Sequence, residues 1–458
     1  MRLRHLRFDL RFGLLGLLMI GGVSQAEVPE TQRTAQMFAL KAGVSAERLQ
    51  KDVTQLVNFG TRHTLSDTIS TTRGIGAARR WIEAEFGRIS ESCGGCLEVT
   101  VTGRIFSGES RIPEPTEVVN VVAILRGESD PNRYVMMSGD IDSRVSDPLD
   151  GESDSPGAND NASGMAGVIE AARLLSQHRF AASIVFAGLS GEEQGLFGGQ
   201  ILAEQAQKEG WFVEAVLNND MIGNVKGING VINNTTVRVF SEGTRATETE
   251  EERRLRRFTG GEVDSPSRNV ARYIDRLADR YFENLDVMMI YRLDRFGRGG
   301  HHRPFNEVGF PAVRIMETNE HYHRQHQDIR TDKGIAYGDV LSGVDFDYAK
   351  RVTALNVLTL AALASAPAPP HAVTIEGQVS PHTTLRWQPV AGAMGYRVYW
   401  RLTTEANWTF SRWVGSQNVA TLENVVIDNY IFGVASVSAE GFESPVVFPG
   451  PIGRFRYP

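Results

Sequence analysis

The stretch Ser183-Ile184-Val185-Phe186-Ala187-Gly188-Leu189-Ser190-Gly191-Glu192-Glu193 decides the fold, because a β-like apolar run ends there in two adjacent acids. Two other apolar runs end in the same way. Tyr134 to Met137 leads to Asp140-Ile141-Asp142, and Val213 to Leu217 leads to Asn219-Asp220-Met221. Parallel strands present the residues that follow them at one rim of the sheet. We therefore expect the three acidic clusters to lie side by side.

Helical patterns alternate with these apolar runs. Strands that alternate with helices predict an α/β fold, a mixed and mostly parallel sheet sandwiched by helices. The helices are expected at Ser45 to Asn58, Gly74 to Phe86, Met165 to Leu175, from the cap Ser265-Pro266-Ser267 to Tyr281, and at Phe346 to Leu363; further strands are expected at Val118 to Leu125 and Phe310 to Met316.

The last part of the chain changes in character. Ser365-Ala366-Pro367-Ala368-Pro369-Pro370 has the composition of a stiff linker, and β-like alternation follows it at Thr384 to Trp387, Gly395 to Arg401 and Tyr430 to Ser438. This tail resembles a fibronectin type III domain, an all-β sandwich, with Trp387 and Tyr396 in its core. The predicted segments are 1–26, 27–364, 365–371 and 372–458: a signal peptide, a catalytic domain, a linker and the sandwich.

Composition narrows the range of partners. The 458 residues are 41% apolar and 22% charged, which is the balance of a folded globular protein. A net charge of −7 without a long basic block argues against nucleic-acid binding. The sequence carries no readable signal of oligomeric state.

The amino terminus has the pattern of an export signal. Four arginines, at positions 2, 4, 7 and 11, precede the apolar run Phe12 to Val23, and Ser24-Gln25-Ala26 offers small residues for cleavage. We expect a periplasmic or extracellular protein; an uncleaved membrane anchor is the alternative. No later segment reaches the ~20 apolar residues of a membrane span, so no integral membrane segment is expected after signal cleavage.

Cys93 and Cys96 are the two cysteines of the chain. In an oxidising compartment such a pair favours a disulfide, and zinc binding by these two residues alone would lack two ligands.

Clustered carboxylates with a histidine point to metal-assisted hydrolysis, which needs ligands for the ion and a base for the attacking water. Glu192 and Glu193 can supply both. Adjacent side chains at the end of a strand diverge, so that one can bind metal while its neighbour faces the water.

Five motifs occur in a fixed order along the chain: Phe59-Gly60-Thr61-Arg62, Gly157-Ala158-Asn159-Asp160-Asn161-Ala162-Ser163-Gly164, Gly191-Glu192-Glu193-Gln194-Gly195-Leu196, Asn219-Asp220-Met221-Ile222-Gly223, and Phe305 with Gly309-Phe310-Pro311-Ala312. Together they resemble one family, the secreted co-catalytic zinc exopeptidases, which include bacterial leucyl aminopeptidases and are related to glutamate carboxypeptidase and glutaminyl cyclase. The resemblance covers most of Asn58 to Leu363.

The resemblance implies two divalent metal ions, zinc in the first place. Asp160 would bridge both ions, Glu193 would bind one and Asp220 the other, while Glu192 would act as the general base. Asp142 would orient a neighbouring ligand, a form of support that metal sites commonly need. The last ligand should be a histidine between Tyr322 and Asp328, with His326 preferred and His323 as the alternative.

Two positions depart from the family pattern. Asp140 stands where the family has the histidine of His-x-Asp, and His301 stands where many relatives have an aspartate. Either residue could complete the second metal site as a ligand. An all-oxygen site with Asp140 would favour manganese, and the other interpretation is that the second site is lost.

We therefore expect an exported, metal-dependent aminopeptidase that acts on peptides. The alternatives are a binding protein on an inactive peptidase scaffold and a glutaminyl cyclase-like enzyme.

Overall fold

The computed structural model describes residues 30–457. The predicted signal peptide, residues 1–26, therefore lies outside the described residues.

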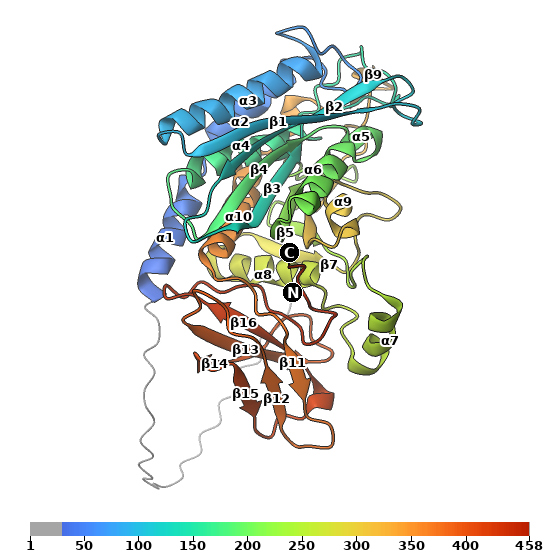
Figure 1. Ribbon diagram of the computed structural model, residues 1–458. Coiled ribbons are helices and arrows are strands. Elements are labelled where there is room, and N and C mark those ends of the chain that lie inside the picture. The colour runs from blue at the N-terminus through green and yellow to red at the C-terminus, as the bar shows by residue number, and fades with distance from the viewer. Residues whose placement is uncertain (1–29, 458) are drawn as a thin grey trace.

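An eight-stranded mixed sheet forms the centre of the larger part of the molecule (Figure 1). The inner strands β4, β3, β5 and β8 are parallel, and β7 runs parallel to β6, whereas β1/β2, β2/β4 and β6/β8 pair in the antiparallel sense. The predicted fold class is confirmed. In sheet order the strands are β1 (Leu97–Phe106), β2 (Thr116–Leu125), β4 (Ala182–Leu189), β3 (Asp130–Asp140), β5 (Phe212–Asn219), β8 (Ala312–Glu317), β6 (Thr236–Phe240) and β7 (Asp286–Ile290).

Helices cover both faces of this sheet, because successive strand residues point to opposite sides. Met137 packs into the core shared with α1–α4, α8 and α10, whereas Met136 packs into the core shared with α6 and α9. The helices are α1 (Glu30–Gly43), α2 (Ala46–Val57), α3 (Gly74–Ser92), α4 (Ala162–Leu175), α5 (Glu192–Gly195), α6 (Phe197–Lys208), α7 (Glu250–Thr259), α8 (Pro266–Tyr281), α9 (His302–Glu307) and α10 (Phe346–Ser365).

Two helices begin at serine caps that the sequence displays. Ser45 Oγ accepts from the Arg48 N–H at the start of α2, and Ser265 Oγ accepts from the Arg268 N–H at the start of α8. α4 lies so close to the sheet that a Cβ on Gly164 would stand 2.3 Å from the Asn219 carbonyl oxygen. This close approach brings the loop before α4 to the end of β5.

Two features of the sheet were not predicted from the sequence. β2 and β3 are consecutive in the chain, but β4 lies between them. β1, β6 and β7 were not predicted; β1 is an edge strand with mostly exposed residues, so it lacks a long apolar run.

The C-terminal part consists of two three-stranded antiparallel sheets. One is β11 (Thr374–Glu376), β12 (Thr383–Arg386) and β15 (Val419–Leu422), and the other is β14 (Phe410–Gly415), β13 (Gly395–Leu402) and β16 (Tyr430–Val437). Trp387 and Tyr396 are buried with ring centroids 5.3 Å apart, as predicted. The likeness to fibronectin type III and the exact domain boundaries remain predictions.

The segment after α10 and the C-terminal end of the chain dock on the amino ends of the main strands. Phe212, the first residue of β5, stacks on Tyr457 at 4.4 Å, and the side chain of Arg133, near the start of β3, donates to the Ala366 carbonyl at 2.6 Å. The opposite rim of the main sheet, where β3, β4 and β5 end, therefore stays outside this interface (Figure 1).

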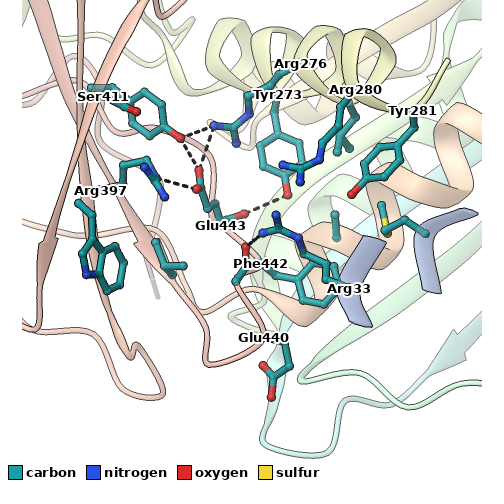
Figure 2. A pocket seen from close by; sticks show the side chains of 17 residues that line it. Arg33, Tyr273, Arg276, Arg280, Tyr281, Arg397, Ser411, Glu440, Phe442 and Glu443 are labelled. Atoms are coloured by element: carbon teal, nitrogen blue, oxygen red, sulfur yellow. Dashed lines mark hydrogen bonds and ion pairs between the residues drawn. The ribbon is translucent and has the colours of Figure 1, made fainter. Parts of the chain in front are cut away.

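A polar pocket of about 700 Å³ lies between α8 and the C-terminal sheets (Figure 2). Glu443 is its centre: the carboxylate accepts from Arg276 at 2.9 Å and from Arg397 at 3.0 Å, and also from the Tyr399 hydroxyl. Tyr273 Oη donates to the Glu443 carbonyl at 2.9 Å. This one acid thus joins residues of both parts.

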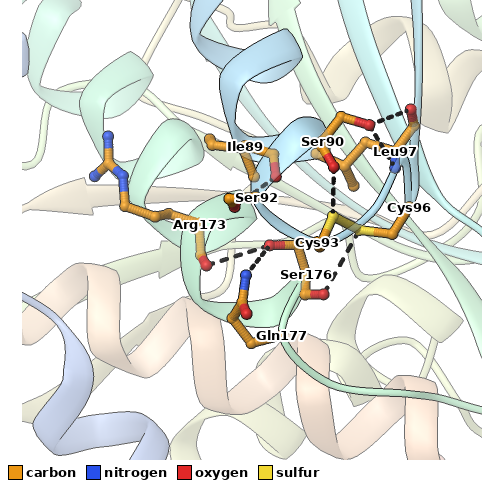
Figure 3. Close-up of a disulfide and its surroundings, with 9 residues drawn as sticks. All are labelled: Ile89, Ser90, Ser92, Cys93, Cys96, Leu97, Arg173, Ser176 and Gln177. Carbon is orange, nitrogen blue, oxygen red and sulfur yellow. Dashed lines mark hydrogen bonds between the residues drawn. A yellow bond between two sulfur atoms is a disulfide. The ribbon is translucent and has the colours of Figure 1, made fainter.

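The predicted disulfide is confirmed: Cys93 and Cys96 are bonded across the turn between α3 and β1 (Figure 3). Two short strands, β9 (Arg330–Asp332) and β10 (Ile335–Tyr337), form a hairpin, and the 3₁₀ turns are η1 (Leu341–Gly343) and η2 (Ile427–Asn429). Among residues 30–457 no helix combines the length and apolar character that a membrane crossing requires.

Candidate metal centre

The predicted acids lie at one rim of the sheet. β3 ends at Asp140, β4 is followed by Ser190-Gly191 and then Glu192 at the start of α5, and β5 leads directly to Asp220. Because β4, β3 and β5 are parallel neighbours, their carboxyl ends lie together. The loop that carries Asp160 reaches the same place immediately before α4.

Asp160, Glu193 and His326 form a compact acid–histidine trio, with one ligand atom of each within 4.8 Å of the others. His326 Nε2 lies 2.9 Å from Asp160 Oδ2 and 2.9 Å from Glu193 Oε1. Burial lowers the pKa of His326, but Glu193 and Asp160 outweigh burial and raise it to about 10. The place between these side chains therefore stabilises positive charge, and two carboxylates with an imidazole are a donor set that fits zinc.

Asp142 supports this trio without joining it. Its carboxylate accepts from the backbone N–H groups of Glu193 at 3.2 Å and Glu192 at 3.3 Å, and from the Thr64 hydroxyl at 3.1 Å. Asp142 thereby fixes the first turn of α5. Asp339 acts similarly on the other side by accepting from the Asp160 N–H at 2.7 Å.

Arg144 is a functional candidate that was not found from the sequence. Its Nε donates to Glu193 Oε2 at 2.8 Å, and its Nη2 lies 2.8 Å from His326 Nδ1. The residue sits in an irregular loop after Asp142, where one arginine among many carries no distinguishing signal.

Glu192 faces the cleft beside the trio. Burial raises the pKa of its carboxyl well above the usual range, and the neighbouring charges of Glu193, Asp220 and Asp140 raise it further. A carboxyl with a raised pKa can both accept and return a proton near neutral pH.

The remaining predicted ligands do not join the trio. Asp140 Oδ1 lies 2.6 Å from His301 Nδ1, and Asp220 Oδ2 lies 2.7 Å from Arg314 Nη2. His323 contacts the ring of Tyr337, with centroids 4.8 Å apart. As they lie, Asp140 and Asp220 are each paired with a basic side chain, and His301 Nε2 is buried without a hydrogen-bond partner in the described part of the chain.

Arginines dominate the wall of the cleft, a cavity of about 580 Å³. Arg295 and Arg298 line the cavity, and each lies near Glu320, at 3.4 Å and 3.2 Å. The arginines of the wall are Arg111, Arg144, Arg295, Arg298 and Arg303.

Comparison with known proteins assigns the family. Residues 120–336 match the profile of Peptidase family M28. A probable zinc metalloprotease of Pyrenophora teres f. teres (strain 0-1) is 42% identical over 421 residues, 91% of this chain and 87% of that protein. A probable zinc metalloprotease of Pyricularia oryzae (strain 70-15 / ATCC MYA-4617 / FGSC 8958) is 43% identical, over 94% of this chain and 87% of that protein. The chain belongs to peptidase family M28.

The matched segment of this M28 peptidase contains every predicted site residue from Asp140 to His326. The LapA aminopeptidase of Legionella pneumophila shares the fold, with a TM-score of 0.52 and 18% identity over 78% of this chain and 80% of that one. The C-terminal sheets lie beyond the family match, although the fungal relatives align with most of the chain.

Proposed function

We propose that this M28 peptidase is a zinc-dependent aminopeptidase that removes N-terminal residues from peptides. The observation that carries the proposal is the acid–histidine trio with Glu192 beside it in one cleft. The names of the fungal relatives support zinc, and the fold shared with an aminopeptidase is consistent with the reaction. The trio accounts for one of the two ions that the family resemblance implies.

A zinc ion held by the trio would polarise the scissile carbonyl and increase the acidity of the attacking water. Glu192 accepts the proton of that water and returns it to the leaving amine. Asp142 holds the turn that carries Glu192 and Glu193, so the base and a ligand keep a fixed relation. The arginine wall suits the carboxylates of peptide substrates.

The test is Glu192→Gln, which keeps the shape of the side chain but removes the base. We expect this variant to retain its metal and to lose roughly 10²- to 10⁴-fold in kcat on aminoacyl nitroanilides. Glu204→Gln, the same change at an exposed glutamate, is the control and should leave kcat unchanged. Full activity of the Glu192 variant would exclude the assigned base.

A binding protein on an inactive scaffold is the second candidate, because Asp140 and Asp220 are engaged by His301 and Arg314. Metal-dependent release of nitroaniline by the wild-type protein separates the two functions, since a pure binding protein releases none.

Export is part of the proposal and rests on the pattern of residues 1–26. We expect mature protein that begins near residue 27 in the periplasm or the medium. N-terminal sequencing of protein from cell fractions checks this. Uncleaved protein in the membrane fraction would instead support an anchor.

A further inference from the structure

Arg314 is a buried cation beside Asp220, which lines the cleft. It lies in β8 and pairs with Asn218 of β5, two residues before Asp220. Its Nη2 lies 2.7 Å from Asp220 Oδ2, and its Nη1 lies 3.1 Å from Asp294 Oδ2 and donates to the Gly299 carbonyl at 2.6 Å. The side chain is 0% exposed, so these contacts hold the guanidinium in one place.

The charges around Arg314 are those that a second metal ion would meet. Burial lowers the pKa of Arg314, but the negative charges of Asp220, Asp294, Glu192 and Asp140 outweigh burial and raise it. The Arg314 guanidinium thus interacts electrostatically with Glu192, the proposed base, and with Asp140 and Asp220, the two carboxylates predicted for the second metal site.

Asp140 is also fully engaged. Its Oδ1 pairs with His301 Nδ1 at 2.6 Å, and its Oδ2 accepts from Asn161 Nδ2 at 2.8 Å. His301 is 0% exposed, and within residues 30–457 Asp140 is the carboxylate that it pairs with. Each Asp140 oxygen therefore already has a hydrogen-bond partner, and one Asp220 oxygen is held by Arg314.

We propose that the catalytic centre holds one metal ion, at the acid–histidine trio, and that the Arg314 guanidinium takes the place of the second. This inference rests on the proposed function. A guanidinium neutralises Asp220 and donates hydrogen bonds, but it has no open coordination position with which to activate water. All water activation by metal then belongs to the trio, and a dication beside Arg314 would be repelled.

The test is the number of metal ions bound per purified full chain. The protein is stripped of metal with a chelator, reloaded with Zn²⁺ or Mn²⁺ and freed of excess ion. Elemental mass spectrometry then measures the bound metal. We expect one ion per chain with either metal. Two ions would overturn the single-ion inference and leave the proposed function intact. No bound ion would contradict the proposed function itself.

Two matched variants show which carboxylate holds the ion. Asp160→Asn should lose the bound metal, whereas Asp220→Asn should keep one ion per chain. Loss of metal in Asp220→Asn that is folded by circular dichroism would overturn the inference. Asp220→Asn removes a partner of the buried Arg314 and can unfold the chain. The metal content is therefore expressed per folded protein.

Substitutions of Arg314 itself test whether its charge excludes a second ion. Arg314→Met removes the charge and should raise the Zn²⁺ content above one ion per chain, whereas Arg314→Lys keeps a cation and should stay at one. A folded Arg314→Met protein that still binds one ion would show that the guanidinium does not exclude the second. If Arg314→Met does not fold, the number of metal ions bound per Asp220→Asn chain still tests the single-ion inference.

Discussion

Arg144 contacts two members of the trio at once, Glu193 through Nε and His326 through Nη2. Loss of a group that orients a metal ligand commonly weakens metal binding. We expect Arg144→Ala to weaken zinc binding by roughly 10- to 100-fold. Competition with a fluorescent chelator measures this change.

Arg303→Ala is the control for Arg144→Ala, because Arg303 lines the same cleft but pairs with the exposed Glu307 at 3.4 Å. It should bind zinc as the wild type does. Equal zinc affinity of Arg144→Ala and Arg303→Ala would show that Arg144 does not orient the trio.

Single residues differ in how far the sequence reveals them. Asp160, Glu193 and His326 stand in motifs with a fixed order, so they could be predicted as neighbours. The pairing of Asp140 with His301 and of Asp220 with Arg314 could not, because the partners are 161 and 94 positions apart in the chain. Arg314 did carry a signal: an arginine inside the apolar strand Ala312–Glu317 needs a buried acid.

Arg62 joins three segments around the metal centre. Its guanidinium donates to the carbonyls of Leu56 at the end of α2, Ile141 after β3 and Gly157 in the loop before α4, at 3.2, 2.9 and 2.9 Å. The residue is 1% exposed. The position of Asp160 relative to Asp142 therefore depends on this one side chain.

We expect Arg62→Met to lower the free energy of unfolding by roughly 3 kcal/mol, because several buried carbonyls lose their charged donor. Urea denaturation measures the change. Arg80→Met is the control: Arg80 also donates to backbone carbonyls, of Thr68 and Ile69, but it is exposed. A similar decrease in the free energy of unfolding in both variants would contradict a special role for Arg62.

The buried strands could be predicted from the sequence more readily than the exposed ones. β4 and β5 are buried along their whole length, so they form continuous apolar runs that the sequence displays. β1, with exposed polar residues at the edge, has no such run. The order β2-β4-β3 could not be predicted either, because it depends on which strands pair rather than on any local pattern.

At the scale of the whole molecule, Glu443 links the C-terminal sheets to α8 through Arg276 (Figure 2). We expect Glu443→Ala to destabilise the protein by roughly 2 kcal/mol, since two arginines lose a charged acceptor. kcat should not change, because the catalytic cleft lies at the other rim of the sheet. Calorimetry and steady-state kinetics measure the two effects.

Glu440→Ala is the matched control for Glu443→Ala, because Glu440 lines the same pocket but is exposed. Its melting temperature should equal that of the wild type. A fall in kcat for Glu443→Ala at full folding would mean that the C-terminal sheets act on the catalytic centre.

The three members of the trio come from positions 160, 193 and 326, far apart along the chain. A ribosome must therefore deliver about seven tenths of the polypeptide before the last of them exists. Copies that stop before residue 326 lack the imidazole and so cannot form the complete trio. Under the proposed function, hydrolysis at this site therefore becomes possible only late in synthesis.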